Sequence, residues 1–104
     1  MLLTKALRKA LPPLYSQEEL GDDAKVVVKF FNPTGSWTWY ATEFDGEDRF
    51  FGLVDGFEAE LGYFSLSELA SYTSPLGLGI ERDMYWTPKT LGEVRAQARS
   101  RRVA

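Results

Sequence analysis

The side chains of this sequence that could do chemistry are limited in kind, because its 104 residues include no cysteine and no histidine. Their absence excludes thiol nucleophiles, Ser–His and Cys–His pairs, and zinc sites built from thiolates or imidazoles. Catalysis would have to rest on carboxylates, lysine, arginine, tyrosine or a Ser–Lys arrangement. We therefore predict no catalytic residue, no metal site and no cofactor, in a protein that is not an enzyme.

One pair of carboxylates keeps an enzymatic alternative open. Glu58 and Glu60 alternate with apolar residues, so both would project from one face of a strand, about 7 Å apart. Paired carboxylates of glycoside hydrolases can have such a separation. Two glutamates on a solvated strand face are much commoner, and a carboxylate enzyme is only our third hypothesis.

The most unusual aromatic segment is the run from Trp37 to Tyr40. In a strand, Trp37 and Trp39 would share one face and Tyr40 would lie on the other. Large aromatic side chains anchor hydrophobic cores, and they are also enriched at the centres of partner-binding sites. These three residues are our first candidates for binding a partner, with a purely structural role as the alternative.

A short charged run, Glu81-Arg82-Asp83, precedes the apolar residues 84–86. A planar guanidinium between carboxylates often locks a fold, and it can also form the polar rim of a site. We add Glu81, Arg82 and Asp83 to the partner-binding candidates, again with a structural role as the alternative.

Charge is distributed unevenly along the chain. Residues 16–83 hold fourteen of the fifteen Asp and Glu residues, whereas both ends are basic. An acidic body repels phosphate backbones, but basic ends brought together on one side could contact nucleic acid. The residues of this second hypothesis are Arg95, Arg99, Arg101 and Arg102, together with Lys5, Arg8 and Lys9. In its inverted form, the acidic body would imitate nucleic acid.

A sheet between residues 25 and 64 must position these candidates. Short runs rich in Val, Phe, Trp and Tyr are separated there by turn residues, which is typical of antiparallel strands. We expect its apolar side to form the core. Early strands are apolar on both faces, with Phe44 opposite Trp39, and such strands need cover on both sides or have one binding side. The expected strands are residues 25–31, 37–44, 49–54 and 57–64, with a short fifth strand over 80–86.

Short helices are expected around the sheet. The first covers residues 1–11, where apolar residues recur at helical spacing. A second follows a capping box that begins at Ser65. The last begins near Thr87 and gives way to a basic C-terminal tail over residues 95–104. The sequence thus predicts one α+β domain over residues 1–104, an antiparallel sheet of four to five strands with short helices packed on it.

The location of the protein follows from what the sequence lacks. No stretch reaches the roughly 18 apolar residues of a membrane span. Three cations interrupt the apolar residues of the N-terminus, where a secretory signal would have an unbroken apolar core. Without cysteine, nothing requires an oxidising compartment. We expect a cytoplasmic protein with no membrane partner.

Five blocks of the sequence carry a family resemblance. They are VVVKFF from Val26, WTWYATE from Trp37, FFGLVDG from Phe50, ELGYFSLSEL from Glu60 and PLGLGIERDMYW from Pro75. The chain resembles the bacterial family known as domain of unknown function 2958. The resemblance implies a small stand-alone protein, often associated with plasmids and other mobile elements. It implies no activity, cofactor or functional residue.

Our leading hypothesis is a non-enzymatic interaction module. The aromatic face of the sheet, with the edge formed by residues 81–83, would bind a protein partner or a second copy of the chain. The reasons are the strands with two apolar faces and the missing catalytic residue types. The alternative is an accessory protein of a mobile element that binds or imitates nucleic acid through its charged regions.

Overall fold

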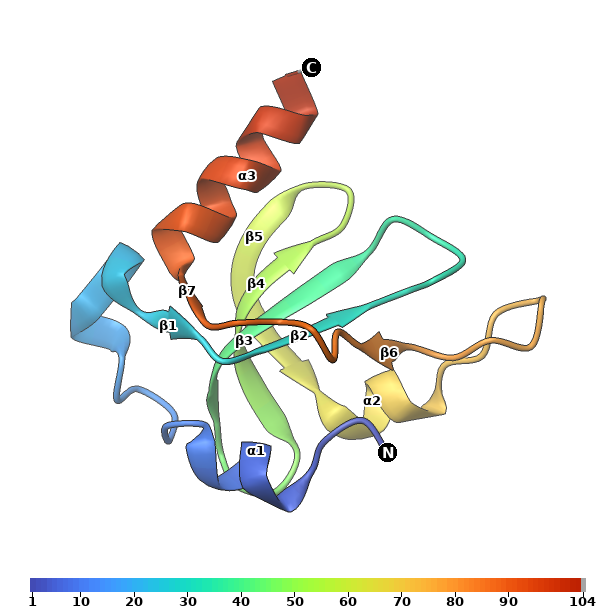
Figure 1. Ribbon diagram of the computed structural model, residues 1–104, viewed down its shortest axis with the longest axis horizontal. Helices are drawn as coiled ribbons and strands as arrows, with labels where there is room; N and C mark the ends of the chain where they lie inside the picture. The colour runs from blue at the N-terminus through green and yellow to red at the C-terminus, as the bar shows by residue number, and fades with distance from the viewer. Residues whose placement is uncertain (104) are drawn as a thin grey trace.

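A computed structural model describes the backbone of residues 1–103 and the side chains of residues 1–101. Figure 1 shows a twisted sheet in the middle of the molecule, with α1 and α3 at opposite ends of it. The elements in chain order are α1 (Lys5–Ala10), the 3₁₀ helix η1 (Glu18–Asp23), β1 (Lys25–Val26), β2 (Val28–Phe31), β3 (Thr38–Phe44), β4 (Arg49–Asp55), β5 (Ala59–Ser65), α2 (Leu66–Ser71), β6 (Glu81–Arg82), β7 (Lys89–Thr90) and α3 (Leu91–Val103).

The main sheet has five strands in the order β5-β4-β3-β2-β6, and every neighbouring pair is antiparallel. The turn between β3 and β4 is closed by the Asp45 carboxylate, which accepts the N–H groups of Glu47, Asp48 and Arg49 at 2.8–3.0 Å. These hydrogen bonds, first that from Glu47, lower the pKa of Asp45. The expected α+β class with an antiparallel sheet is confirmed.

The first expected strand, residues 25–31, is broken at Val27 into two strands. β2 pairs with β3 in the main sheet, whereas β1 pairs with β7 in a separate two-stranded sheet. The break lets the fully buried Val26 join a different part of the core from Val28. The uniform run of apolar residues gave no sign of it.

The expected fifth strand is also shorter than residues 80–86. Only Glu81 and Arg82 pair with β2. The strand stops because Asp83 starts a turn: its carboxylate accepts the N–H of Tyr85 at 3.0 Å, and its carbonyl accepts that of Trp86 at 3.3 Å. Side-chain capping of this kind is a common role of aspartate in turns.

The second helix agrees with expectation, whereas the first is shorter than residues 1–11, because the Thr4 hydroxyl accepts the Leu7 N–H and α1 begins only at Lys5. The third helix differs at both ends. The Ser65 hydroxyl accepts the Glu68 N–H at 2.9 Å, which caps α2. α3 begins after Thr90 instead of Thr87, because Thr90 and Glu93 form a reciprocal capping box. The N–H of Thr90 lowers the pKa of Glu93. The helix continues to Val103, so the backbone from Arg95 onward is helical where we expected a tail.

Both faces of the main sheet carry core, although we expected the core on one side of the sheet. One cluster lies beside α1 and α2, and it is centred on Phe30 and Phe50, whose rings are fully buried. The other lies beneath α3, where Leu53 packs with Leu91 and Val94. Strands with two apolar faces thus find cover on both.

A bulge in β3 sets the faces of its last residues. The register with β4 shifts between Ala41 and Glu43, so Thr42 is an extra residue in β3. Beyond it Phe44 faces the first cluster, with Trp39, while Glu43 turns to the opposite face. Our expectation that Phe44 lies opposite Trp39 was therefore wrong, since strict alternation holds only in an unbroken strand.

The anchored carboxylate of Glu43 holds the segment between α1 and η1. Glu43 is buried and accepts the N–H of Tyr15 at 2.8 Å and that of Gln17 at 2.7 Å. Tyr15 has a φ of 72°, a conformation that costs energy for a residue with a side chain. These two charge-assisted hydrogen bonds offset that cost.

We predict that Glu43→Gln lowers the free energy of unfolding by about 2–3 kcal/mol, because one N–H then faces an amide NH₂ in a buried site. Glu47→Gln, in an exposed turn, is the control and should change it by less than about 0.5 kcal/mol. Urea denaturation followed by circular dichroism measures both. Equal effects of the two variants would contradict the anchoring role.

Two facing glycines of β4 and β5 provide a second test. A Cβ atom added to Gly52 would lie 1.8 Å from the Tyr40 carbonyl oxygen, whereas at Gly62 it would meet no atom within 4 Å. We expect Gly52→Ala to lower the free energy of unfolding by more than about 2 kcal/mol and Gly62→Ala to change it by less than about 1 kcal/mol. Thermal denaturation of the two variants measures the difference. A Gly52→Ala variant as stable as wild type would disprove the close approach of β3 to β4.

Candidate functional site

Trp37 and Trp39 line a hollow on the face of the sheet that carries α2. Both side chains are half-buried and their ring centroids lie 6.1 Å apart, so part of each ring is open to solvent. The hollow has a volume of about 430 Å³, in the range of sites that hold small ligands. Its lining residues are Asn32, Trp37, Trp39, Phe64, Ser65, Glu68, Leu69, Tyr72 and Ile80.

A second hollow shares Trp37 with the first. Phe57 forms one of its walls, is 87% exposed and meets the Trp37 ring edge-on with a centroid distance of 5.4 Å. We call the two hollows together the tryptophan groove. The second is lined by Trp37, Val54, Phe57, Glu58 and Glu60.

Glycines position the rings of the tryptophan groove. The ring of Trp37 lies against the turn between β4 and β5, where a Cβ atom at Gly56 would come within 2.6 Å of it. Gly62, between Glu60 and Phe64 on the same face of β5, leaves open space above the strand. Small residues in the strands thus leave room beside the large rings.

The rim of the tryptophan groove is acidic. Glu58, Glu60 and Glu68 are exposed and line it, and no Lys or Arg among the described side chains does. Aromatic faces attract cations through their quadrupole, and carboxylates attract them directly. An apolar, anionic groove suits a ligand that carries apolar and positively charged groups.

A family model described as "Protein of unknown function (DUF2958)" matches residues 2–102. The chain belongs to this family. The match confirms the resemblance of the five sequence blocks, and the family description gives no sign of catalysis. No curated protein and no solved structure matches this member of the family. Among residues 1–103, none of the helices has the length and apolar character needed to cross a membrane.

Tyr40 lies away from the tryptophan groove. It is buried on the opposite face of β3, where its ring packs against Trp86 at 5.8 Å and the Lys29 ammonium lies over it at 5.9 Å. Of the three aromatic candidates in β3 and its approach, only Trp37 and Trp39 are brought together with open surface.

The charged run at β6 serves the fold at the far edge of the sheet. Arg82 donates to the carbonyl oxygens of Met1 and Leu2, and so ties down the N-terminus. Asp83 forms an ion pair with Lys29 at 3.6 Å. Glu81 is exposed, and none of the three charged residues lines the tryptophan groove.

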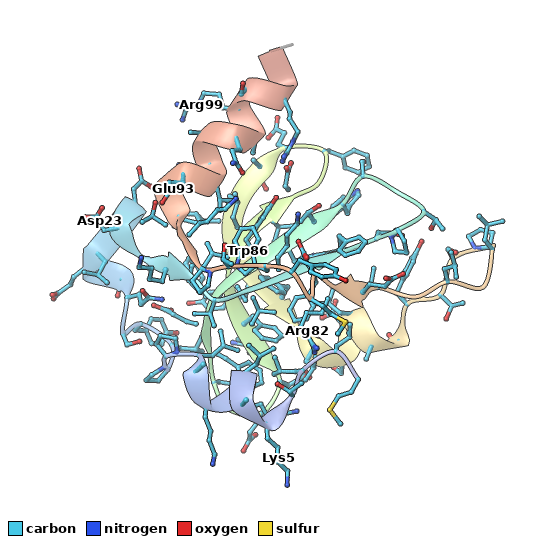
Figure 2. The ribbon with its side chains drawn as sticks, in the orientation of Figure 1. Lys5, Asp23, Arg82, Trp86, Glu93 and Arg99 are labelled. Atoms are coloured by element: carbon cyan, nitrogen blue, oxygen red, sulfur yellow. The ribbon has the colours of Figure 1, made fainter. Side chains whose placement is uncertain are left out.

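The basic ends are not brought together. Figure 2 places Lys5 and Arg99 at opposite ends of the molecule. Arg95 pairs with Asp22 at 3.4 Å and Arg101 with Asp55 at 2.6 Å. The hydrogen bond to Asp55 raises the pKa of Arg101. The side chain of Arg102 lies outside the described residues, and the described cations do not form the single basic surface that our second hypothesis requires.

The carboxylate pair of our third hypothesis lies at the groove rim. Glu60 is in β5 and Glu58 in the preceding turn, both exposed. Among the described side chains, no three acidic residues are grouped so that they could hold a metal ion.

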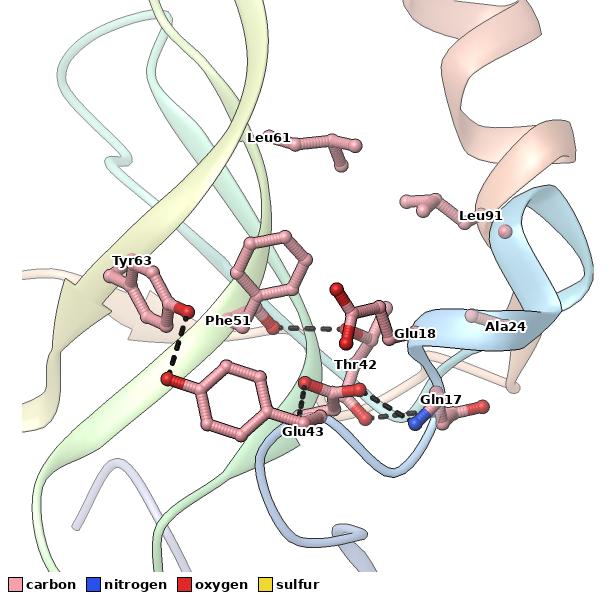
Figure 3. A pocket seen from close by; sticks show the side chains of 11 residues that line it. Gln17, Glu18, Ala24, Thr42, Glu43, Phe51, Leu61, Tyr63 and Leu91 are labelled. Atoms are coloured by element: carbon pink, nitrogen blue, oxygen red, sulfur yellow. Dashed lines mark hydrogen bonds between the residues drawn. The ribbon is translucent and has the colours of Figure 1, made fainter.

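A smaller hollow of about 190 Å³ lies on the opposite face of the sheet, between β5 and η1. Figure 3 shows Phe51 and Tyr63 among the side chains that line it. Tyr63 donates to Tyr15 at 3.3 Å, and this contact raises the pKa of Tyr63. Leu61 and Leu91 form its far wall.

Sequence reasoning missed the other residues of the tryptophan groove. Phe57 was placed at the start of an expected strand, without a link to Trp37. The available signal was the turn at Gly56, which places the residue after it beside the start of β3. Leu69 and Phe64 could not be linked to the tryptophans without the sheet register.

We expect Trp37→Ala to lower the free energy of unfolding by about 1–2 kcal/mol, since part of its ring stays in water, whereas Phe50→Ala, at a fully buried ring, should cost about 3–5 kcal/mol. Urea denaturation of both variants measures the difference. Equal losses would show that Trp37 is a core residue and remove it from the binding candidates.

Proposed function

We propose that this protein is a non-enzymatic interaction module, which binds an apolar, positively charged segment of a protein partner in the tryptophan groove. The observation that carries the proposal is the pairing of two partly exposed tryptophans with a rim of glutamates that no Lys or Arg of the described lining neutralises. Tryptophan is among the residue types enriched at binding hot spots.

The charge of the groove favours a protein partner over a second copy of the chain. Two copies meeting at this groove would bring Glu58, Glu60 and Glu68 of each together, and like charges at an interface cost several kcal/mol. A segment with Lys or Arg gains from the same carboxylates. The absence of cysteine suits a partner met in the cytoplasm, in keeping with the resemblance to proteins of bacterial mobile elements.

Nucleic acid is the less favoured partner. The cations available for phosphate are divided between the two ends of the molecule, and two arginines of α3 already pair with carboxylates. Phosphate would meet repulsion from the acidic groove rim.

The test is a selection of random heptapeptides displayed on phage against the immobilised protein. We expect enriched peptides that combine Lys or Arg with apolar residues, binding more weakly at 500 mM than at 50 mM salt. Trp37→Ala should lower the affinity for the best synthetic peptide at least tenfold, and Glu60→Gln should lower it about two- to fivefold, as measured by calorimetry.

Tyr85→Ala is the matched control, because Tyr85 is 96% exposed and does not line the groove. It should leave binding unchanged. Enrichment of no peptide, or of peptides that bind Trp37→Ala as tightly as wild type, would overturn the proposal. So would salt-sensitive binding of a 20-base DNA duplex that competes with the peptides.

A further inference from the structure

The long edge of the main sheet is unpaired. β5 is the outermost strand next to β4, seven residues long, and its register with β4 runs without a bulge from Ala59 to Ser65. The opposite edge is β6, with only two residues. Natural edges are usually protected by charged side chains, especially lysine, by proline, by a bulge or by short length, and of these β5 has only the charge of Glu60.

The outward backbone groups of β5 follow from the ladder. Leu66 donates its N–H to the Asp48 carbonyl at 2.8 Å, and Gly56 donates to the Glu58 carbonyl at 3.0 Å, both in line with the β4–β5 register. Bonded and non-bonded pairs alternate in an antiparallel ladder. Glu60, Gly62 and Phe64 therefore bond to β4.

Leu61 and Tyr63 consequently point their N–H and C=O groups away from the sheet. Within the part of the chain that the structure describes, these outward N–H and C=O groups make no hydrogen bond. Their side chains are 43% and 49% exposed. The edge is thus open for a further strand.

Hollows lie beside β5 on both faces of the sheet. Glu60 and Phe64 belong to the tryptophan groove on one face, and Leu61 and Tyr63 line the smaller hollow on the other (Figure 3). Successive side chains of an added strand point alternately to these two faces. On the groove side, the open space over Gly62 leaves room for a long side chain from the neighbouring strand.

We infer that the partner segment binds as an extended strand added to the free edge of β5, an inference that rests on the proposed function. Alternate residues with Lys or Arg point to the glutamate rim and Trp37, and the residues between them point to Leu61 and Tyr63. Main-chain hydrogen bonds supply affinity in this mode, and the two faces supply specificity. A cationic segment is favoured over β5 of a second copy, which would carry the same Glu58 and Glu60 to the edge.

Two N-methylated forms of the best heptapeptide from the phage selection test the inference. One form has methyl groups on the odd-numbered backbone nitrogens and the other on the even-numbered ones, so the side chains stay identical. In an added strand, only one set of N–H groups faces β5. We expect one form to bind within about threefold of the parent and the other at least tenfold more weakly.

Amide hydrogen exchange of the wild-type protein, read by nuclear magnetic resonance, is the second measurement. In the free protein, the amides of Leu61 and Tyr63 should exchange at least tenfold faster than those of Gly62 and Phe64. The parent peptide should slow Leu61 and Tyr63 at least tenfold. A peptide that binds in a Trp37-dependent way, with equal affinity for both methylated forms and no protection of Leu61, overturns strand addition and leaves the proposed function intact.

Failure of the selection itself overturns the proposed function and this inference together. Sedimentation equilibrium tests whether a second copy of the chain pairs with β5 instead. A wild-type dimer at micromolar concentration, in which Leu61 and Tyr63 amides are already protected and which the peptide does not dissociate, would show that a second copy pairs with β5 and would overturn the partner segment.

Discussion

The extra residue in β3 is the constraint on which much of the structure depends. Because of the bulge at Thr42, Phe44 packs into the cluster beside α1, while Glu43 faces the other side of the sheet. The N-terminal segment after α1 passes this end of β3. There Phe44 donates its N–H to the Pro12 carbonyl, and Glu43 accepts the N–H groups of Tyr15 and Gln17. One irregularity thus connects the two faces and fixes the path of the N-terminal segment.

The open edge follows from the order in which the chain builds the sheet. β3, β4 and β5 form consecutive hairpins, but after β5 the chain enters α2 and returns to the far side, where β6 pairs with β2. No described segment comes back to pair with β5. The apolar residues Leu61 and Tyr63 therefore stay partly in water, at a cost in hydrophobic free energy that a bound segment would recover.

Local chemistry made much of this fold predictable. Turn residues between aromatic and β-branched runs located β3, β4 and β5, and Ser65 located the start of α2. Features decided by tertiary contacts escaped prediction. The break at Val27 depends on β7, which is distant in sequence, and the bulge at Thr42 has no glycine or proline to announce it. Thr90 and Glu93 did carry a capping signature, but we placed the start of the helix at Thr87 because a proline, Pro88, follows it.

The candidate site was predictable only in part, for a related reason. The aromatic run marked Trp37 and Trp39 as unusual, and the strand period separated them correctly from Tyr40. Which tryptophan surface stays open depends on Gly56, Phe57 and α2, all brought there by the sheet register. The charged run at residues 81–83 was attractive by composition, yet its contacts are with the N-terminus and Lys29.

Trp86 lies in a different environment from the other two tryptophans of the chain. Its Nε1 donates to the Val26 carbonyl at 3.0 Å, and the ammonium groups of Lys29 and Lys89 lie 5.7 and 5.2 Å from its ring centroid. Trp37 and Trp39 are the other two, and both border the groove. Because Trp86 packs against Tyr40 on the opposite face of the sheet, a ligand in the groove would directly change the emission of Trp37 and Trp39 only, which gives this protein a built-in reporter that needs no attached dye.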